Sequence, residues 1–302
     1  MDAAEAIAIN EIVPLPAYED LWESIVISNG IKDRLLRTAL LSFRLRADLP
    51  FDVSALHGLI VLYGPPGNGK TTLARSLGQE IAPYTKQRHV RLIEVNPHGL
   101  MSSEHGQSQQ KVSELLVDHI PALADDGLPT VVVLDEVESM AVARSEASLS
   151  ANPADVHRAT DAVLTALDRL ATSSKNLLFV ATSNFTTALD TAFLSRADAV
   201  FELPTPDAAA AASILTATLS AMAKTYPKLG SLIGQAGLID VGKALGGADG
   251  RQIRKAVTEA MAIRLETVQD PGELQVADLL AAAKDHVRWD RSTLKGAEVG
   301  ET

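Results

Sequence analysis

The sequence of 302 residues contains no cysteine. This absence excludes disulfide bonds, thiolate catalysis and zinc sites built from cysteine. No uninterrupted apolar run reaches the roughly 18 residues that a membrane span needs. Acidic Asp2 and Glu5 also stand where a signal peptide would be basic. We therefore expect a soluble, cytoplasmic globular protein without a membrane partner.

Clusters of basic residues are missing as well. The chain has 27 Lys and Arg against 38 Asp and Glu, so its formal net charge is −11. Nucleic acid, which attracts lysine and arginine gathered on one face, is therefore not expected as the main partner, although a local basic patch stays open. The hydrophobic fraction of 46% is sufficient for a core in one large or two ordinary domains.

The most informative stretch is a glycine-rich loop that fits the pattern G-x-x-x-x-G-K-[ST]. In this pattern glycines let backbone N–H groups face phosphate oxygens, the lysine reaches the β and γ phosphates, and the hydroxyl holds Mg²⁺. An expected strand over 59–62 precedes the loop. An expected helix over 71–81 follows it and points its N-terminus at the anion. The predicted nucleotide-binding residues are Gly64, Pro65, Pro66, Gly67, Asn68, Gly69, Lys70, Thr71 and Thr72.

Two further apolar strands, expected over 131–134 and 177–182, end in polar side chains. Ligands of open α/β sheets bind at the carboxyl ends of the strands, so we expect Asp135 beside the Mg²⁺ of the loop. Glu136 is then placed to polarise an attacking water. Asn184, after the second strand, is placed to hold that water or to contact the γ-phosphate.

Composition divides the chain into four segments. Residues 1–20 are acidic and proline-containing, so we expect an extended arm with little helix or strand character. We expect a large α/β domain over 21–205, with a central parallel sheet flanked by helices. The alanine-rich remainder predicts an all-α domain over 206–289 and a disordered tail over 290–302. Its expected helices are 207–224, 239–245, 251–266 and 274–287.

Four other side chains are candidates for a functional role. Trp22 and Ile25 precede a helix expected over 29–46, and they either line an adenine pocket or pack in the core. Arg196 lies where it could cross a subunit boundary. Arg251 falls in the first turn of a helix, where the macrodipole disfavours a cation unless an anion such as a nucleotide phosphate is near.

From about Trp22 to Val287, the order of these motifs resembles that of the AAA+ ATPases. Within them it resembles the pachytene checkpoint family, whose members remodel HORMA-domain proteins. The resemblance implies an AAA+ fold with a helical lid, and ATP and Mg²⁺ as ligands. It rests on the phosphate loop and on residues 22–25, 135–140, 153–158, 162–168, 182–184, 195–198 and 250–255.

The resemblance also implies a hexameric ring, in which each subunit supplies an arginine finger to its neighbour. Such a finger typically raises the rate about 10³–10⁵-fold. The implied roles are phosphate and Mg²⁺ ligands for Lys70 and Thr71, second Mg²⁺ contact for Asp135, activation of water for Glu136, sensor 1 for Asn184, sensor 2 for Arg251 and the finger for Arg196.

Two features depart from the family pattern. Only about twenty residues precede the linker, so the chain looks like a short bacterial relative. Such relatives accompany HORMA proteins and a cyclic-nucleotide synthase in anti-phage operons, and dismantle the activating complex. Where the family has aromatic pore-loop residues, this chain has Met101, Glu104, His105 and Gly106. In the family the aromatic residues grip an extended polypeptide. Either this chain grips through its backbone, Met101 and His105, or the alignment of this loop is shifted. A plain solvated loop is a further alternative.

We therefore predict a hexameric, ATP-driven remodeller of a HORMA-domain complex that restrains cyclic-nucleotide-based anti-phage signalling. One alternative is a remodeller of another client, such as a metabolic-enzyme activase or a complex-disassembly ATPase. Another is a nucleotide-gated scaffold without turnover, against which the intact Glu136 and Arg196 argue.

Overall fold

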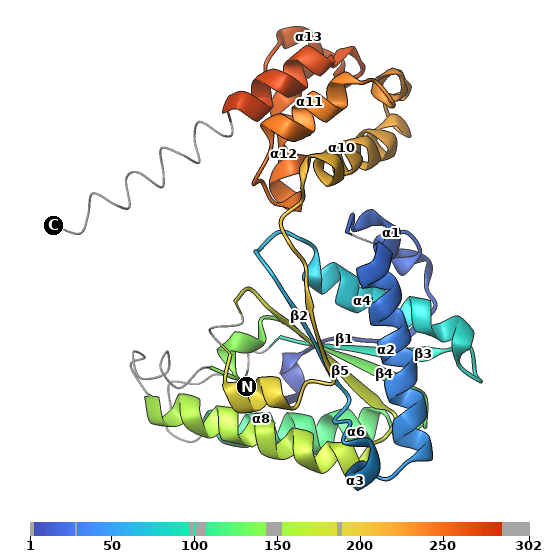
Figure 1. Cartoon of the computed structure of the whole chain (residues 1–302), viewed down its shortest axis with the longest axis vertical. Helices are drawn as coiled ribbons and strands as arrows, with labels where there is room; N and C mark the ends of the chain where they lie inside the picture. Colours follow the sequence, from blue (N-terminus) through green and yellow to red (C-terminus); the bar gives the residue numbers. More distant parts are fainter. Residues whose placement is uncertain are drawn as a thin grey trace, which may run out of the picture. The chain divides into compact units, whose positions relative to one another are not determined.

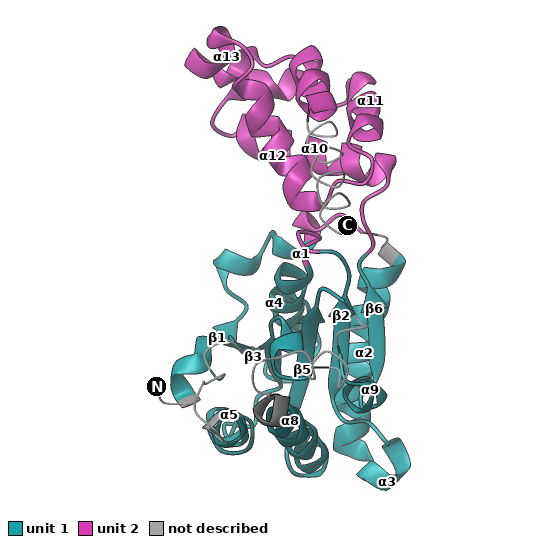
Figure 2. Cartoon of the chain, turned by 90° about the vertical axis from the view of Figure 1, so that its left-hand side faces the viewer, with its two compact units in different colours: residues 1–22, 28–65, 70–203 teal, residues 23–27, 66–69, 204–302 magenta. Residues whose placement is uncertain are grey.

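A six-stranded sheet lies at the centre of the first of two units into which the chain divides. The computed structural model describes residues 3–27, 29–96, 100, 107–142, 153–185 and 189–285. Unit 1 comprises residues 1–22, 28–65 and 70–203, and unit 2 comprises residues 23–27, 66–69 and 204–302 (Figure 2). The domain limits expected from the sequence stay predictions.

The strand order of the sheet is β1-β3-β4-β5-β2-β6. All neighbours pair in parallel except β1 and β3, which are antiparallel. The predicted central parallel sheet is therefore confirmed. Every residue of β4 and β5 is buried, which explains why these strands read as unbroken apolar runs. The strands are β1 (Ile7–Val13), β2 (Leu59–Tyr63), β3 (Val90–Val95), β4 (Thr130–Leu134), β5 (Leu177–Ser183) and β6 (Ala199–Glu202).

The amino-terminal segment differs from the expectation of an arm without strand character. β1 pairs with β3 along its length and forms one edge of the sheet. The N–H of Leu15 then donates to Gln79 Oε1 at 2.9 Å, which ties the following residues to helix α4. The expectation of an arm was based on the prolines at the end of the segment. The apolar alternation of Ile7 and Ile9 is the pattern of a half-buried strand and would have predicted β1.

Helices cover both faces of the sheet (Figure 1). One core joins alternate sheet residues such as Val61 and Val132 with Val163 and Leu167 of α8. In the described residues, no helix is long and apolar enough to cross a bilayer. The helices are α2 (Asn29–Asp48), α3 (Phe51–Ser54) and α4 (Lys70–Ile81), then α5 (Gln107–Ser113), the π-helix η5 (Glu114–His119), α6 (Ile120–Leu123), α8 (Pro153–Ser173) and α9 (Thr191–Ser195). The shorter elements are η1 (Ala3–Ala6), η2 (Pro16–Tyr18), α1 (Leu21–Ser24), η3 (Ala82–Tyr84) and η6 (Val137–Ser139).

Unit 2 is helical, as the sequence predicts, with its own apolar core. The helix expected over 251–266 is wrong at its end, because α12 stops at Met261 and α13 begins at Leu265. Between them Arg264 adopts an extended conformation and forms a two-pronged ion pair with Asp278, which draws the chain out of the helix. The elements are α10 (Ala208–Ala223), η8 (Pro227–Leu232), α11 (Gly237–Ala244), α12 (Gly250–Met261), α13 (Leu265–Gln269), η9 (Pro271–Glu273) and a helix over 276–285. The expected tail lies outside the described residues.

Candidate functional site

Three neighbouring strands bring the predicted side chains of unit 1 together. β5 lies between β4 and β2, and all three run in the same direction. The residues that follow them therefore meet at one edge of the sheet. The glycine-rich loop follows β2, Asp135 follows β4 and Asn184 follows β5. This is the edge at which the sequence analysis expected a ligand.

Lys70, the first residue of α4, is buried at this edge. Its ammonium group donates to Gly64 O at 2.7 Å, to Pro65 O at 2.9 Å and to Asn184 Oδ1 at 3.0 Å. An ammonium group has three N–H donors, so these acceptors match its capacity. A phosphate group would have to replace one or more of them.

One carboxylate oxygen of Asp135 accepts hydrogen bonds from two hydroxyl groups. Thr71 Oγ1 and Thr182 Oγ1 each lie 2.6 Å from Asp135 Oδ1, a distance typical of hydrogen bonds to an ionised carboxylate. Thr71 was expected beside Asp135, whereas Thr182 was not predicted as a site residue. A hydroxyl near the end of a buried strand needs a polar partner, and its place in the sequence could therefore have identified Thr182 as a site residue.

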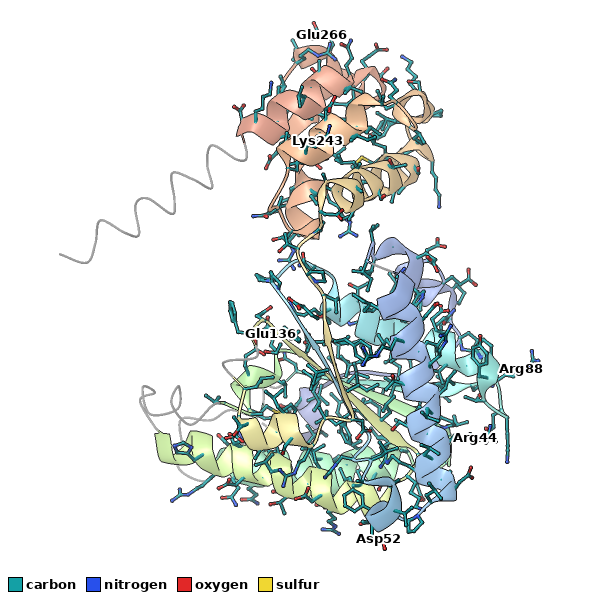
Figure 3. All side chains as sticks on the ribbon, viewed as in Figure 1. Arg44, Asp52, Arg88, Glu136, Lys243 and Glu266 are labelled. Atoms are coloured by element: carbon teal, nitrogen blue, oxygen red, sulfur yellow. The ribbon has the colours of Figure 1, made fainter. Side chains whose placement is uncertain are left out.

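Glu136 follows in a left-handed backbone conformation, with φ 49° and ψ 52°. Such strain in a residue other than glycine is uncommon and concentrates at functional sites. Its N–H donates to Thr182 Oγ1 at 3.0 Å, so one hydroxyl holds both acidic residues. The Glu136 side chain is exposed (Figure 3).

A close approach of two backbones requires glycine at the first position of the loop. Gly64, with φ 148°, approaches the backbone of Leu203 so closely that a Cβ would overlap its carbonyl oxygen. Thr71 and Asp135 supply the hard oxygen atoms that Mg²⁺ prefers, and Mg²⁺ usually takes one or two carboxylates together with substrate phosphates. The described residues contain no cluster of three or more His, Cys, Asp or Glu side chains fit for a metal. The donor set therefore fits Mg²⁺ held jointly with a nucleotide.

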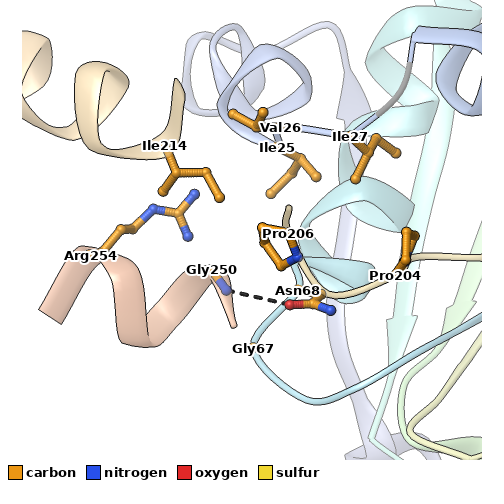
Figure 4. Close-up of a pocket in the computed structure, with 10 residues that line it drawn as sticks. All are labelled: Ile25, Val26, Ile27, Gly67, Asn68, Pro204, Pro206, Ile214, Gly250 and Arg254. Atoms are coloured by element: carbon orange, nitrogen blue, oxygen red, sulfur yellow. Dashed lines mark hydrogen bonds between the residues drawn. The ribbon is translucent and has the colours of Figure 1, made fainter. Parts of the chain in front are cut away.

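Residues 66–69 of the loop belong to unit 2, where Gly67 and Asn68 line a pocket (Figure 4). Asn68 Oδ1 accepts from the N–H of Gly250 at 3.4 Å. Ile25 is buried and also lies in the lining of this pocket, so its contact with a base stays a prediction. The remaining lining residues are Val26, Ile27, Pro204, Pro206, Ile214, Gly250 and Arg254.

Trp22 does not line the pocket. It is buried in unit 1, with the ammonium of Lys32 5.8 Å from its ring centroid. For Trp22, the core alternative is therefore the one that the structure supports.

Arg251 lies in the first turn of α12, as expected. Asp249 caps this helix by accepting from the N–H groups of Arg251 and Gln252, each at 2.8 Å. The Arg251 side chain is exposed and is not part of the pocket lining. Arg254, on the next turn, does line it and donates to Ser24 O at 3.1 Å. Arg254 was not predicted as a site residue, although it lies three residues after Arg251 near the same end of α12.

Arg196 lies at the opposite end of the parallel sheet from Lys70. It precedes β6, whose first residue pairs with Ile60, and the N–H of Asp198 donates to Leu59 O at 2.7 Å. At about 3.3 Å per residue, β2 separates its two ends by about 13 Å. The structure therefore does not bring Arg196 together with the loop of its own chain.

A carboxylate fixes the orientation of Arg196. Its Nε and Nη2 each donate to Asp168 at 2.7 Å, and its Nη1 donates to Ala192 O at 2.8 Å. This pair raises the pKa of Arg196 and lowers that of Asp168, chiefly through its hydrogen bonds. His57 Nε2 lies 3.3 Å from the same carboxylate. Because a guanidinium has five N–H donors, two stay without a partner among the described residues.

The predicted pore-loop residues lie outside the described part of the chain, so their role stays a prediction. They are Met101, Glu104, His105 and Gly106.

The chain is similar in sequence to several known proteins. Residues 60–205 match the ATPase family associated with various cellular activities (AAA). The chain is 47% identical to CD-NTase-associated protein 6 of Pseudomonas aeruginosa, over 90% of this chain and 89% of that protein. It is 40% identical to the Pachytene checkpoint protein 2 homolog of Arabidopsis thaliana, over 62% of this chain and 40% of that protein.

A solved structure shares the fold. A chain of the E. coli MS115-1 HORMA:CdnC:Trip13 complex matches with a TM-score of 0.76, over 94% of this chain and 97% of that chain. The sequence identity is 18%, so this likeness shows the fold alone.

Proposed function

The chain belongs to the AAA family of ATPases, alongside the CD-NTase-associated and pachytene checkpoint proteins, and we propose that it uses ATP and Mg²⁺ to remodel a HORMA-domain protein. In this proposal the HORMA protein is bound to a cyclic-oligonucleotide synthase. Its disassembly restrains anti-phage signalling in the cytoplasm. The name of the Pseudomonas relative and the composition of the E. coli complex support this client.

The chemistry assigned to unit 1 is hydrolysis of the γ-phosphate. Lys70 gives up protein acceptors for phosphate oxygens, and Thr71 and Asp135 hold Mg²⁺. When bound, Mg²⁺ neutralises charge on the β and γ phosphates. Glu136 accepts a proton from the attacking water, and Asn184 orients that water or the γ-phosphate.

Arg196 completes the site of a neighbouring subunit in the proposed homo-hexamer. Its position at the opposite end of the sheet from Lys70 supports action between subunits rather than within one. The two open N–H donors of its guanidinium suit phosphate oxygens. Hydrolysis then depends on assembly.

The pocket of unit 2 is assigned to the nucleotide base. Ile25 supplies apolar surface there, and Arg254 is the basic side chain in its lining. Arg251 serves as sensor 2 in this proposal, the role that the family resemblance implies, and its exposed side chain is accessible to a ligand.

The observation that carries the proposal is the meeting of Lys70, Thr71, Asp135 and Asn184 at one edge of the sheet, from three different strands. The decisive experiment mixes the protein and Mg-ATP with a preassembled complex of a HORMA protein and its synthase. We expect release of the synthase, measured by size-exclusion chromatography. Glu136→Gln serves as the hydrolysis-deficient control.

Three results would distinguish the alternatives. Release in wild type and not in the control supports the proposal. ATP hydrolysis without release indicates another client. ATP binding without hydrolysis indicates a nucleotide-gated scaffold.

A further inference from the structure

Glu138, which the sequence analysis gave no role, lies against Asn184. Glu138 Oε1 accepts from the backbone N–H of Asn184 at 3.1 Å and from its side-chain Nδ2 at 3.2 Å. Glu138 belongs to η6, the short helical turn that directly follows the strained Glu136. One carboxylate oxygen therefore holds both the main chain and the amide of Asn184.

Opposite charges on its two sides define the orientation of the Asn184 amide. On one side the Lys70 ammonium can only donate, so the amide must present Oδ1 to it, at 3.0 Å. On the other side the Glu138 carboxylate, when ionised, can only accept, so the amide must present Nδ2. A flipped amide would place two donors together at Lys70 and two acceptors together at Glu138.

The second oxygen of the carboxylate argues against a purely structural role. Glu138 Oε2 is buried and has no hydrogen-bond partner among the described residues. A buried acceptor without a partner lowers stability, so an apolar side chain of similar size would serve packing better. The presence of a carboxylate is explained by what Oε1 does for Asn184.

We propose that Glu138 is a positioning residue that holds the Asn184 amide in the orientation needed for hydrolysis, an inference that rests on the proposed ATPase function. When phosphate takes Lys70 away from Asn184 Oδ1, the two hydrogen bonds to Glu138 keep Asn184 in place. The second N–H of Nδ2 stays available for the water or the γ-phosphate. Glu138 thus acts only through Asn184.

The test is a double-mutant cycle between Glu138→Leu and Asn184→Ala. Leucine keeps the volume of glutamate and removes the acceptor, whereas Glu138→Gln keeps an acceptor oxygen. We expect Glu138→Leu to lower kcat about 10–100-fold, the usual range for residues that orient a site. We expect Glu138→Gln to recover most of this loss. The double variant should be no slower than Asn184→Ala alone, because the two residues act as a unit.

A second readout does not depend on turnover. The Kd of a fluorescent ATP analogue, measured in EDTA, should stay within about 2-fold of wild type in Glu138→Leu, since Lys70 and the loop are intact. Glu202→Ala is the matched control. Its carboxylate lies at the same end of the sheet but accepts from Tyr63 Oη at 3.2 Å rather than from Asn184. Glu202→Ala should change neither kcat nor the Kd of the ATP analogue.

Several outcomes would overturn the inference. They are additive losses in the double variant, an unchanged kcat in Glu138→Leu, or equal losses in Glu138→Leu and Glu138→Gln. Should Glu138→Leu not fold, Glu138→Ala takes its place in the cycle. A wild-type protein without ATPase activity refutes the proposed function itself, whereas an active wild type with an additive cycle refutes only the role of Glu138.

Discussion

Replacing Thr182 by valine tests whether one buried hydroxyl organises the acidic residues of the site. Thr182 is 1% exposed, and valine has nearly the same shape. The change removes the 2.6 Å hydrogen bond to Asp135 Oδ1 and the acceptor of the Glu136 N–H. Asp135 then keeps Thr71 as its hydroxyl partner. The left-handed turn at Glu136 loses the hydrogen bond that anchors its backbone N–H.

Two magnitudes follow from these contacts. A hydrogen bond to a charged group contributes about 1.5–3 kcal/mol to stability. Since the hydrogen bond from the Glu136 N–H is only partly buried, we expect the free energy of unfolding to fall by about 2 kcal/mol. Loss of a group that orients a metal ligand usually lowers activity or metal affinity about 10–100-fold, so we expect a change of that size in kcat and in the Mg²⁺ concentration for half-maximal activity.

Steady-state ATP hydrolysis across a Mg²⁺ titration, with urea unfolding of the same samples, measures both effects. Thr182→Ser keeps the hydroxyl and should recover most of the activity. Thr130→Val is the matched control, because Thr130 is also fully buried in the sheet but donates to Leu128 O at 3.0 Å. It should lose about 1 kcal/mol of stability without a change in Mg²⁺ dependence. Equal Mg²⁺ dependence in wild type and Thr182→Val would show that the Thr182 hydroxyl does not position Asp135.

The other predictions concern the roles proposed above. Glu136→Gln should bind ATP with near-normal Kd and lose nearly all turnover; substantial hydrolysis would remove Glu136 from the mechanism. Arg196→Ala should lower kcat about 10³-fold or more with ATP binding retained, and rings doped with it should lose the neighbouring site's activity; loss confined to the variant's own site contradicts action between subunits. Asp168→Asn should lower kcat about 10-fold or more, because the guanidinium loses a charged anchor, and an unchanged kcat argues against that anchor. Alanine at both Met101 and His105 should slow HORMA disassembly more than basal ATPase; equal disassembly rates would exclude this loop.

Features with a local cause could be predicted from the amino-acid sequence. The glycines of the loop, the lysine at the start of α4 and the carboxylates that end β4 are set by the backbone conformations and apolar runs around them. The cap of α12 by Asp249 is also local, since donor and acceptor are two or three residues apart. Because the strands are parallel, the residues that follow them meet at the same end of the sheet.

Contacts between segments far apart in sequence depend on how the chain folds and could not be predicted. Thr182 meets Asp135, and Glu138 meets Asn184, because β5 lies beside β4, and no local pattern specifies which strands are neighbours. β1 can pair with β3 because Pro14 and Pro16 follow its last residue, Val13, and therefore remove no donor from the ladder. The position of Arg196, at the end of the sheet away from its own Lys70, likewise follows from the parallel register of β6 on β2.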